Sequence, residues 1–305
     1  SAGRKVCTGD HAVIIGDCAG HELTHSGANI LMGELAACQM CCGFNNVVVG
    51  KRAGMGLTGR ISPSDVSLGA NANVFIGAYT ARCMRRECNT VVGTLAGQFN
   101  STGQHNTFLG VNAGRGPSDS SATNTGTANV YVGSGAGINA RGGSYNIAIG
   151  RNVGMAISTG VNLIIMGCGA GACQISGFNN IYMGNLAGAC ATNATQNIFM
   201  GQQAGRKNIS GGLKIAIGDN AGECGMGDST SGGLAIGHCT LRCDTCGVGN
   251  VALGNAAGMR LTCGQNIFMG QGTGVNATAA HANTFLGNYV GGCFTTGKKN
   301  TFVGC

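Results

Sequence analysis

Cysteines are the residues of this chain with the greatest capacity for covalent chemistry. There are 17 of them in 305 residues. So many thiols are unusual in a reducing compartment, so their number favours an oxidising, extracellular setting, and the odd count leaves at least one thiol free or paired between chains. Many lie five or six residues after a regularly recurring glycine. Cysteines at the same distance from this glycine in adjacent repeats are therefore expected to lie side by side. Equal phase in adjacent repeats, six residues after the glycine in two pairs and nine in the third, predicts three disulfides: Cys173 with Cys190, Cys224 with Cys243, and Cys246 with Cys263.

A zinc site is the rival use of one group of these residues. His238, Cys239, Cys243 and Cys246 include a Cys-x-x-Cys pair and four zinc-type ligands. The second ligand pair of a zinc finger is missing, so we expect neither a bound metal nor another cofactor. The 11 acidic residues are scattered singly, and no Walker lysine, G-x-S-x-G or H-E-x-x-H motif is present. The sequence therefore predicts that the protein is not an enzyme.

A repeat of about 17 residues positions these side chains. Its clearest copy is N-I-F-M-G-Q-Q-A-G at Asn197–Gly205, where three apolar residues end at a glycine, here called the marker glycine. Eleven of the 16 spacings between markers are 17 residues. Such a period is typical of solenoids, whose repeats bury their apolar faces by stacking. We predict an all-β fold, a β-solenoid (β-roll or β-helix) of 17 coils forming one continuous array over residues 1–305. The markers are Gly16, Gly33, Gly50, Gly77, Gly93, Gly110, Gly133, Gly150, Gly167, Gly184, Gly201, Gly218, Gly237, Gly254, Gly270, Gly287 and Gly304.

The three residues before each marker form a short predicted strand. Alternation places its first and third residues on one face and its middle residue on the other. The first and third are mostly Val, Ile, Leu, Met or Thr, and we expect them inside the coil. The middle residues would then form an outer aromatic ridge, a lateral interface that favours a homotrimer. The alternative is a flattened coil whose two sheets share the middle residues. The ridge consists of Phe75, Phe108, Tyr131, Tyr182, Phe199, Phe268, Phe285 and Phe302.

Asparagine and glycine mark the corners of the repeat. Asn lies four residues before the marker in 13 of the 17 copies, and stacked amides can form a ladder along the solenoid. A second glycine four residues after the marker indicates a corner with positive φ. The remaining residues form a polar, variable arc that also takes the long insertions between Gly50 and Gly77 and between Gly110 and Gly133.

The variable arc carries basic residues and glycosylation sequons. The net charge is +7, and a basic stripe could attract anionic surface glycans, although a solvated outer arc explains it as well. Aromatic residues are not interleaved with the stripe, so we expect no nucleic acid partner. No apolar stretch approaches the ~20 residues of a membrane span. The stripe comprises Arg4, Lys5, Arg82, Arg115, Arg206, Lys207, Arg242 and Arg260. The sequons, whose place in the arc suits surface glycosylation, lie at Asn100, Asn193, Asn208 and Asn276.

The two ends of the sequence continue the same repeat. Joining Gly304 and Cys305 to Ser1, Ala2 and Gly3 makes a corner and places Gly16 17 residues after Gly304. We therefore expect copies to stack head to tail into filaments, with Cys305 able to lock the junction.

The repeat phrases also resemble a known class of fibres. Asn106–Gly114 (NTFLGVNAG), Asn197–Gly205 (NIFMGQQAG) and Asn283–Gly291 (NTFLGNYVG) are similar to the NTFLGxxAG repeats of phage and algal-virus fibres and, more distantly, to the β-roll heads of trimeric autotransporter adhesins. The resemblance implies a trimeric, extended fibre used for attachment. We expect a structural protein, an extracellular self-assembling filament reinforced by disulfides; the alternative is a viral or bacterial fibre shaft that binds surface glycans.

Overall fold

The chain folds into two compact units built from short strands. The computed structural model describes residues 1–6, 8–57, 71–118, 125–226, 232–244 and 248–305. Within these residues there is no helix, and every strand is three residues long. Contacts group the chain into unit 1, Ser1–Thr159, and unit 2, Gly160–Cys305. Each unit is a β-solenoid of stacked parallel coils, which confirms the predicted fold class; one array running through both units stays a prediction.

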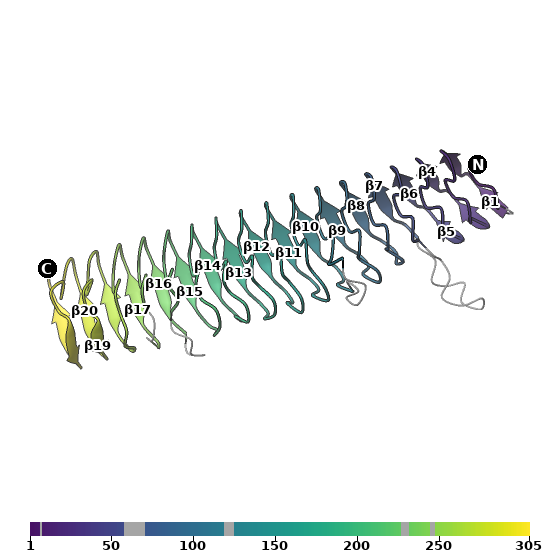
Figure 1. Ribbon diagram of the computed structural model, residues 1–305. Helices are drawn as coiled ribbons and strands as arrows, with labels where there is room; N and C mark the ends of the chain where they lie inside the picture. Colours follow the sequence, from purple (N-terminus) through teal and green to yellow (C-terminus); the bar gives the residue numbers. More distant parts are fainter. Residues whose placement is uncertain (7, 58–70, 119–124, 227–231, 245–247) are drawn as a thin grey trace. The chain divides into compact units, whose positions relative to one another are not determined.

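Unit 1 contains a main sheet of eight parallel strands in the order β2-β4-β6-β7-β8-β9-β10-β11 (Figure 1). A second parallel sheet has the order β1-β3-β5. The bounds are β1 Thr8–Asp10, β2 Val13–Ile15, β3 His25–Gly27, β4 Ile30–Met32, β5 Cys42–Phe44, β6 Val47–Val49, β7 Val74–Ile76, β8 Thr90–Val92, β9 Thr107–Leu109, β10 Val130–Val132 and β11 Ile147–Ile149.

Unit 2 repeats this arrangement. Its main sheet runs from β12 through β18 and then to β20 and β22, all parallel. A two-stranded sheet joins β19 and β21. The bounds are β12 Ile164–Met166, β13 Ile181–Met183, β14 Ile198–Met200, β15 Ile215–Ile217, β16 Leu234–Ile236, β17 Val251–Leu253, β18 Ile267–Met269, β19 Ala279–His281, β20 Thr284–Leu286, β21 Thr296–Lys298 and β22 Thr301–Val303.

Strand register follows the repeat even where its length changes. Tyr131 is paired with Ala148, 17 residues away, as the regular period requires. Val47 is paired with Val74, although 27 residues separate them, and Thr107 with Val130 across 23 residues. The two long insertions therefore leave the ladder of strands intact, as predicted.

The corners depend on glycine because successive coils touch through their backbones. Gly184 has φ 134°, and a Cβ on it would lie 2.5 Å from the carbonyl oxygen of Gly201 in the next coil. Gly205, four residues after its marker, has φ 57°, and a Cβ there would lie 2.5 Å from the ring of Phe199. Side chains at either position would force a coil apart, since a Cβ does not fit within 3 Å of another heavy atom.

Buried asparagines form the predicted ladder inside the corner. The backbone N–H and the side-chain Nδ2 of Asn197 both donate to Asn180 Oδ1, at 2.9 and 3.2 Å. The Nδ2 of Asn197 also donates to the carbonyl of Gly211 at 3.2 Å, across the same coil. Each amide therefore fixes the next coil and its own arc, which satisfies polar groups that would be costly to bury alone. In unit 1 the ladder runs through Asn29, Asn46, Asn73, Asn89, Asn106, Asn129 and Asn146.

The middle residue of each strand, rather than the flanking pair, fills the core. Phe199 and Tyr182 are 0% exposed and stack with ring centroids 5.2 Å apart; Phe108 and Tyr131 stack at 5.1 Å. The predicted outer aromatic ridge is therefore wrong. Of its members, only Phe302 of β22 is exposed, at 38%, while Phe75, Phe108, Tyr131, Tyr182, Phe199, Phe268 and Phe285 are buried.

The width of the coil explains this reversal. A three-residue strand directs only its middle side chain inward, and a narrow coil has room for one large side chain at that level. Alanines three residues after the markers, such as Ala187 and Ala204, are also fully buried, and the glycine one residue further on packs directly against the ring. Large middle residues are thus complemented by small residues in the same coil, which leaves the first and third residues on the outside.

Candidate functional site: an exposed aliphatic sheet face

The first and third residues of the main-sheet strands form a partly exposed, largely apolar surface in each unit, which we call the outer aliphatic face. In unit 1, Val13 is 46% and Ile15 55% exposed, and Ile76 remains 40% exposed among paired strands. Apart from two threonines, all are aliphatic or Met, and none is charged. The members are Val13, Ile15, Ile30, Met32, Val47, Val49, Val74, Ile76, Thr90, Val92, Thr107, Leu109, Val130, Val132, Ile147 and Ile149.

Unit 2 presents a face of the same kind. Ile236, Ile267 and Met269 are 37–39% exposed, and the remaining members are also open to solvent in part. The members are Ile164, Met166, Ile181, Met183, Ile198, Met200, Ile215, Ile217, Leu234, Ile236, Val251, Leu253, Ile267, Met269, Thr284, Leu286, Thr301 and Val303.

The size of this face exceeds what a solitary protein normally exposes. Summed over its members, the face of each unit exposes on the order of 1,000 Å² of largely apolar surface, whereas the largest patch on a typical monomer is about 300–600 Å². One partner of a standard protein interface contributes about 800 Å². The face thus has the area and the largely apolar character of an interface, and none of its members has an acidic, basic or thiol side chain.

A buried carboxylate in unit 2 lies between two arginines. Glu223 is only 6% exposed at its side chain, and it accepts from Arg206 Nη2 at 3.0 Å and from Arg242 Nε at 2.8 Å, each in an adjacent coil. Burial by itself raises the pKa of Glu223, but Arg242, Arg206 and Lys207 outweigh it and hold that pKa below its ordinary value. The cluster clamps three coils together; its carboxylate is committed to the arginines.

The structure brings one predicted cysteine pair into contact. Cys224 and Cys243 lie in adjacent coils as thiols, with Sγ atoms 3.5 Å apart. Burial, followed by the contact with Cys224, raises the pKa of the Cys243 thiol. Cys173 and Cys190 are exposed free thiols in neighbouring coils, as the repeat predicts, and Cys263 is a half-buried free thiol. Cys246, the predicted partner of Cys263, lies outside the described residues.

The group considered for zinc does not converge among the described residues. His238 Nε2 lies 3.4 Å from the Cys239 sulfur and 3.9 Å from a carboxylate oxygen of Asp219. In the part of the chain that the structure describes, no three His, Cys, Asp or Glu side chains are placed to hold a metal. Cys246 again falls outside that part.

Two of the four sequons are wrongly assigned to the surface. Asn100 is 0% exposed, with Oδ1 accepting from the backbone N–H of Gly103 at 3.0 Å. Asn208 is 1% exposed and accepts from Lys214 Nζ at 2.6 Å. Both occupy an inward position of the arc, seven residues after a marker. Asn193 and Asn276 are exposed as expected.

Lys214 is a buried residue that sequence analysis missed. It replaces asparagine in the ladder position, is 0% exposed, and its backbone N–H donates to Asn197 Oδ1 at 3.0 Å. Its ammonium turns inward to Asn208 Oδ1 and to the carbonyl of Ser210 at 3.3 Å. The signal was available, because position 214 has the phase of an inward asparagine.

The residues of the predicted subunit junction are each hydrogen-bonded to a neighbouring coil of their own unit or exposed to solvent. The Ser1 amino group donates to Asp17 Oδ1 at 3.1 Å, and Gly3 donates to the carbonyl of Ala19 at 2.9 Å. Ala2 and Cys305 are exposed, and Gly304 donates to the carbonyl of Leu286 at 3.0 Å. Head-to-tail contact between copies stays a prediction.

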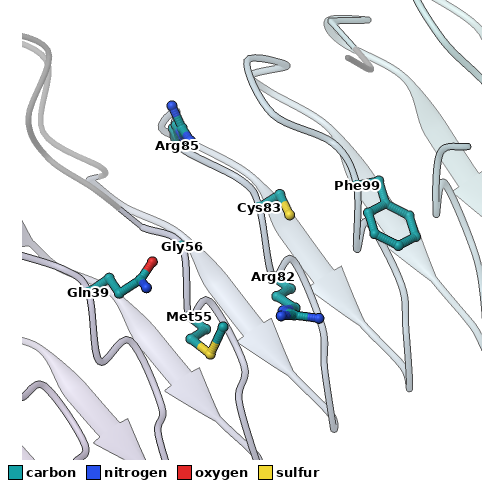
Figure 2. Close-up of a pocket in the computed structure, with 7 residues that line it drawn as sticks. All are labelled: Gln39, Met55, Gly56, Arg82, Cys83, Arg85 and Phe99. Atoms are coloured by element: carbon teal, nitrogen blue, oxygen red, sulfur yellow. The ribbon is translucent and has the colours of Figure 1, made fainter. Parts of the chain in front are cut away.

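Three basic residues of the stripe form ion pairs. Lys5 pairs with Glu22 at 2.6 Å, and Arg206 and Arg242 pair with Glu223. Arg82 instead lines a pocket of about 380 Å³ in unit 1, which sequence analysis also missed. Figure 2 shows its side chains spread along successive coils. With Arg82, the lining residues are Gln39, Met55, Gly56, Cys83, Arg85 and Phe99.

The comparisons add no relative to this description. No protein-family model matches the chain, and no curated protein and no solved structure matches it. None of the residues that the structure describes belongs to a helix with the length and apolar character needed to cross a membrane.

Proposed function

We propose that this protein is a structural subunit of an extracellular fibre, and that copies associate side by side through their outer aliphatic faces. The single observation that carries the proposal is an uncharged apolar sheet face of about 1,000 Å² in each unit, because exposing such an area to water is unfavourable. The many cysteines support the extracellular setting. The resemblance to viral fibre repeats supports the same class.

The most suitable partner for the face is a second copy of the chain. Its side chains recur once per coil, about every 4.8 Å along the stack. A partner that interdigitates with them over several coils needs the same period, and another copy supplies it. Flat sheets pack face to face at ~10 Å with apolar side chains between them. We propose a dimer or trimer built this way, with head-to-tail stacking extending it into a filament.

The experiment that tests the proposal introduces charge into the face. The variant Ile147→Lys/Ile149→Lys/Ile267→Lys/Met269→Lys places two lysines on β11 and two on β18. The control Ser134→Lys/Asn139→Lys/Asn255→Lys/Asn276→Lys adds the same charge at exposed residues outside the strands. Sedimentation velocity at several concentrations measures the assembly. The face variant should sediment as one chain while the wild type and control associate; association of all three would refute the proposal.

A further inference from the structure

The pocket of unit 1 is an opening in one column of the solenoid. Gln39, Gly56, Cys83 and Phe99 each lie six residues after a marker glycine, so they stack in successive coils. Gly56 contributes no side chain to the column. Its N–H donates to the carbonyl of Arg82 at 2.7 Å, and a Cβ on it would lie 2.5 Å from that oxygen. The close backbone contact therefore keeps the column open at this coil.

Two guanidinium groups belong to the coil beside this opening. Arg82 is half-buried and Arg85 is exposed, and both line the pocket (Figure 2). Among the described residues, no ion pair involves either of them, whereas Arg206 and Arg242 of the same stripe are paired with Glu223. Two arginines with planar donor groups can bind a carboxylate or sulfate through paired hydrogen bonds.

The other walls supply an aromatic ring, an apolar side chain and an amide. Phe99 is half-buried, and the Arg115 guanidinium lies 5.5 Å from its ring centroid. Met55, next to Gly56 in the chain, is half-buried, and Gln39, in the preceding coil of the column, is exposed. An apolar wall can pack against the C–H face of a sugar ring, while the Gln39 amide can donate to and accept from hydroxyl groups.

We propose that this pocket binds an acidic saccharide, a short glycan that carries carboxylate or sulfate groups. The four coils from Gln39 to Phe99 span roughly 14 Å at ~4.8 Å per coil, which accommodates a di- or trisaccharide. The volume of about 380 Å³ lies within the usual range of small-ligand sites, about 300–1,000 Å³. A single aromatic residue cannot stack a run of bases, which disfavours single-stranded nucleic acid. The site lies within unit 1 and does not depend on lateral association.

Calorimetric titration of the full chain with defined oligosaccharides tests this inference. A heparin hexasaccharide offers sulfates and carboxylates, a hyaluronan hexasaccharide offers carboxylates alone, and maltohexaose is neutral. At low ionic strength at least one acidic oligosaccharide should bind about tenfold or more tightly than maltohexaose, because charge-assisted bonds are the stronger ones. Equal binding of all three, or no binding, would overturn the proposal, as would tighter binding of a thymidine hexanucleotide.

A matched pair of variants separates the pocket from general charge. Arg82→Gln/Arg85→Gln removes both guanidinium groups of the pocket, while Arg151→Gln/Arg260→Gln removes two exposed arginines outside it. The pocket variant should lose at least about tenfold in affinity and the control less than about threefold, since scattered surface charges act only through the screened field. Equal losses would show nonspecific attraction and overturn the site.

Thiol protection in the unaltered protein gives a second readout that needs no variant. Cys83 lines the pocket, while Cys88, five residues later in the chain, is an exposed thiol that does not line it. The acidic hexasaccharide that binds more tightly in the calorimetric titration, heparin or hyaluronan, should at saturation slow the alkylation of Cys83 by iodoacetamide about fivefold or more and leave Cys88 unchanged, because a bound sugar restricts access to the thiol. An unchanged rate at Cys83 would contradict occupancy of the pocket.

Discussion

Asn46 donates twice to the same oxygen of Asn29: its backbone N–H lies 2.9 Å and its Nδ2 3.0 Å from Asn29 Oδ1. The two side chains are fully buried and stand in adjacent coils. One amide thus serves the backbone of the next coil and the side chain of its counterpart. This double contact, repeated along the ladder, fixes the spacing of the coils on which every exposed surface depends.

Interrupting the ladder should open the solenoid locally. In Asn106→Ala, the hydrogen bond from Asn106 Nδ2 to the carbonyl of Gly126, at 3.0 Å, is lost, and the backbone N–H of Asn129 loses its acceptor at 2.9 Å. Buried unsatisfied groups cost about 1–3 kcal/mol each. Native-state hydrogen exchange around residues 89–129 should show a local opening free energy lower by about 2–5 kcal/mol. The control Asn139→Ala, at an exposed residue of the same unit, should change it by less than about 0.5 kcal/mol. Equal exchange in both variants would refute the ladder's role.

Removing a buried aromatic ring should be far more costly than removing an exposed one. Phe199 is 0% and Phe178 49% exposed. Phe199→Ala leaves a cavity and should lower stability by about 3–5 kcal/mol, while Phe178→Ala should cost less than about 1 kcal/mol. Urea unfolding followed by circular dichroism compares the two variants. A small loss of stability in Phe199→Ala, similar to that in Phe178→Ala, would contradict the inward orientation of the middle residues.

Acid should weaken the clamp around Glu223. The folded-state pKa of this carboxyl is lower than its ordinary 4.5, so its contribution is present above that value and is lost as the pH falls through the folded pKa. Glu223→Gln should lower the free energy of unfolding by about 1–2 kcal/mol at pH 7, because the neutral amide cannot form the charged contacts with the arginines. The variant has no carboxylate to protonate, so its stability should decline less steeply below pH 4.5 than that of the wild type. Unfolding midpoints from pH 7 to pH 3 measure this.

The exposed pair Glu34–Lys51, at 2.9 Å, is the control for that measurement. Glu34→Gln should cost less than about 1 kcal/mol at neutral pH, as exposed ion pairs generally do. If Glu223→Gln and the wild type lose stability in parallel below pH 4.5, the clamp does not contribute as described.

Cys224 and Cys243 should form a disulfide before Cys173 and Cys190, because the sulfur atoms of the first pair already lie 3.5 Å apart. Thiol–disulfide exchange with glutathione disulfide removes two hydrogens from the pair, forms one S–S bond and yields two reduced glutathione molecules. The raised pKa of the Cys243 thiol predicts a rate that still climbs above pH 9.0, since the thiolate is the reacting form. Peptide mapping over time detects the order, and the linkage should stabilise the protein by about 3 kcal/mol. Formation of the Cys173–Cys190 disulfide first would contradict this order. The control Cys243→Ser cannot form the Cys224–Cys243 disulfide and should not gain its stabilisation.

The positions of the strands could be predicted because each has a local cause. Marker glycines such as Gly184 lie where successive backbones touch, and the buried asparagines lie where amides can stack. Both requirements recur with the period of the sequence. They therefore also predicted the register across insertions, as in the pairing of Val47 with Val74.

The inward face could not be read from alternation, because both faces of the strands are apolar. What decides it is the pairing of one large side chain with small residues of the same coil, as Phe199 packs against Gly205. Phe108 with Gly114 and Tyr182 with Gly188 repeat this relation. The pocket was missed for a related reason: Gly56 differs from its column neighbours only by lacking a side chain.

The most direct measurement is a cryo-electron microscopy reconstruction of the purified protein at high concentration. It reports both the number of chains in cross-section and the surfaces at which they meet. The account predicts two or three chains side by side with Ile147, Ile149, Ile267 and Met269 and their column neighbours buried between copies. Single chains with these residues in water, or copies joined only through the polar arcs, would contradict it.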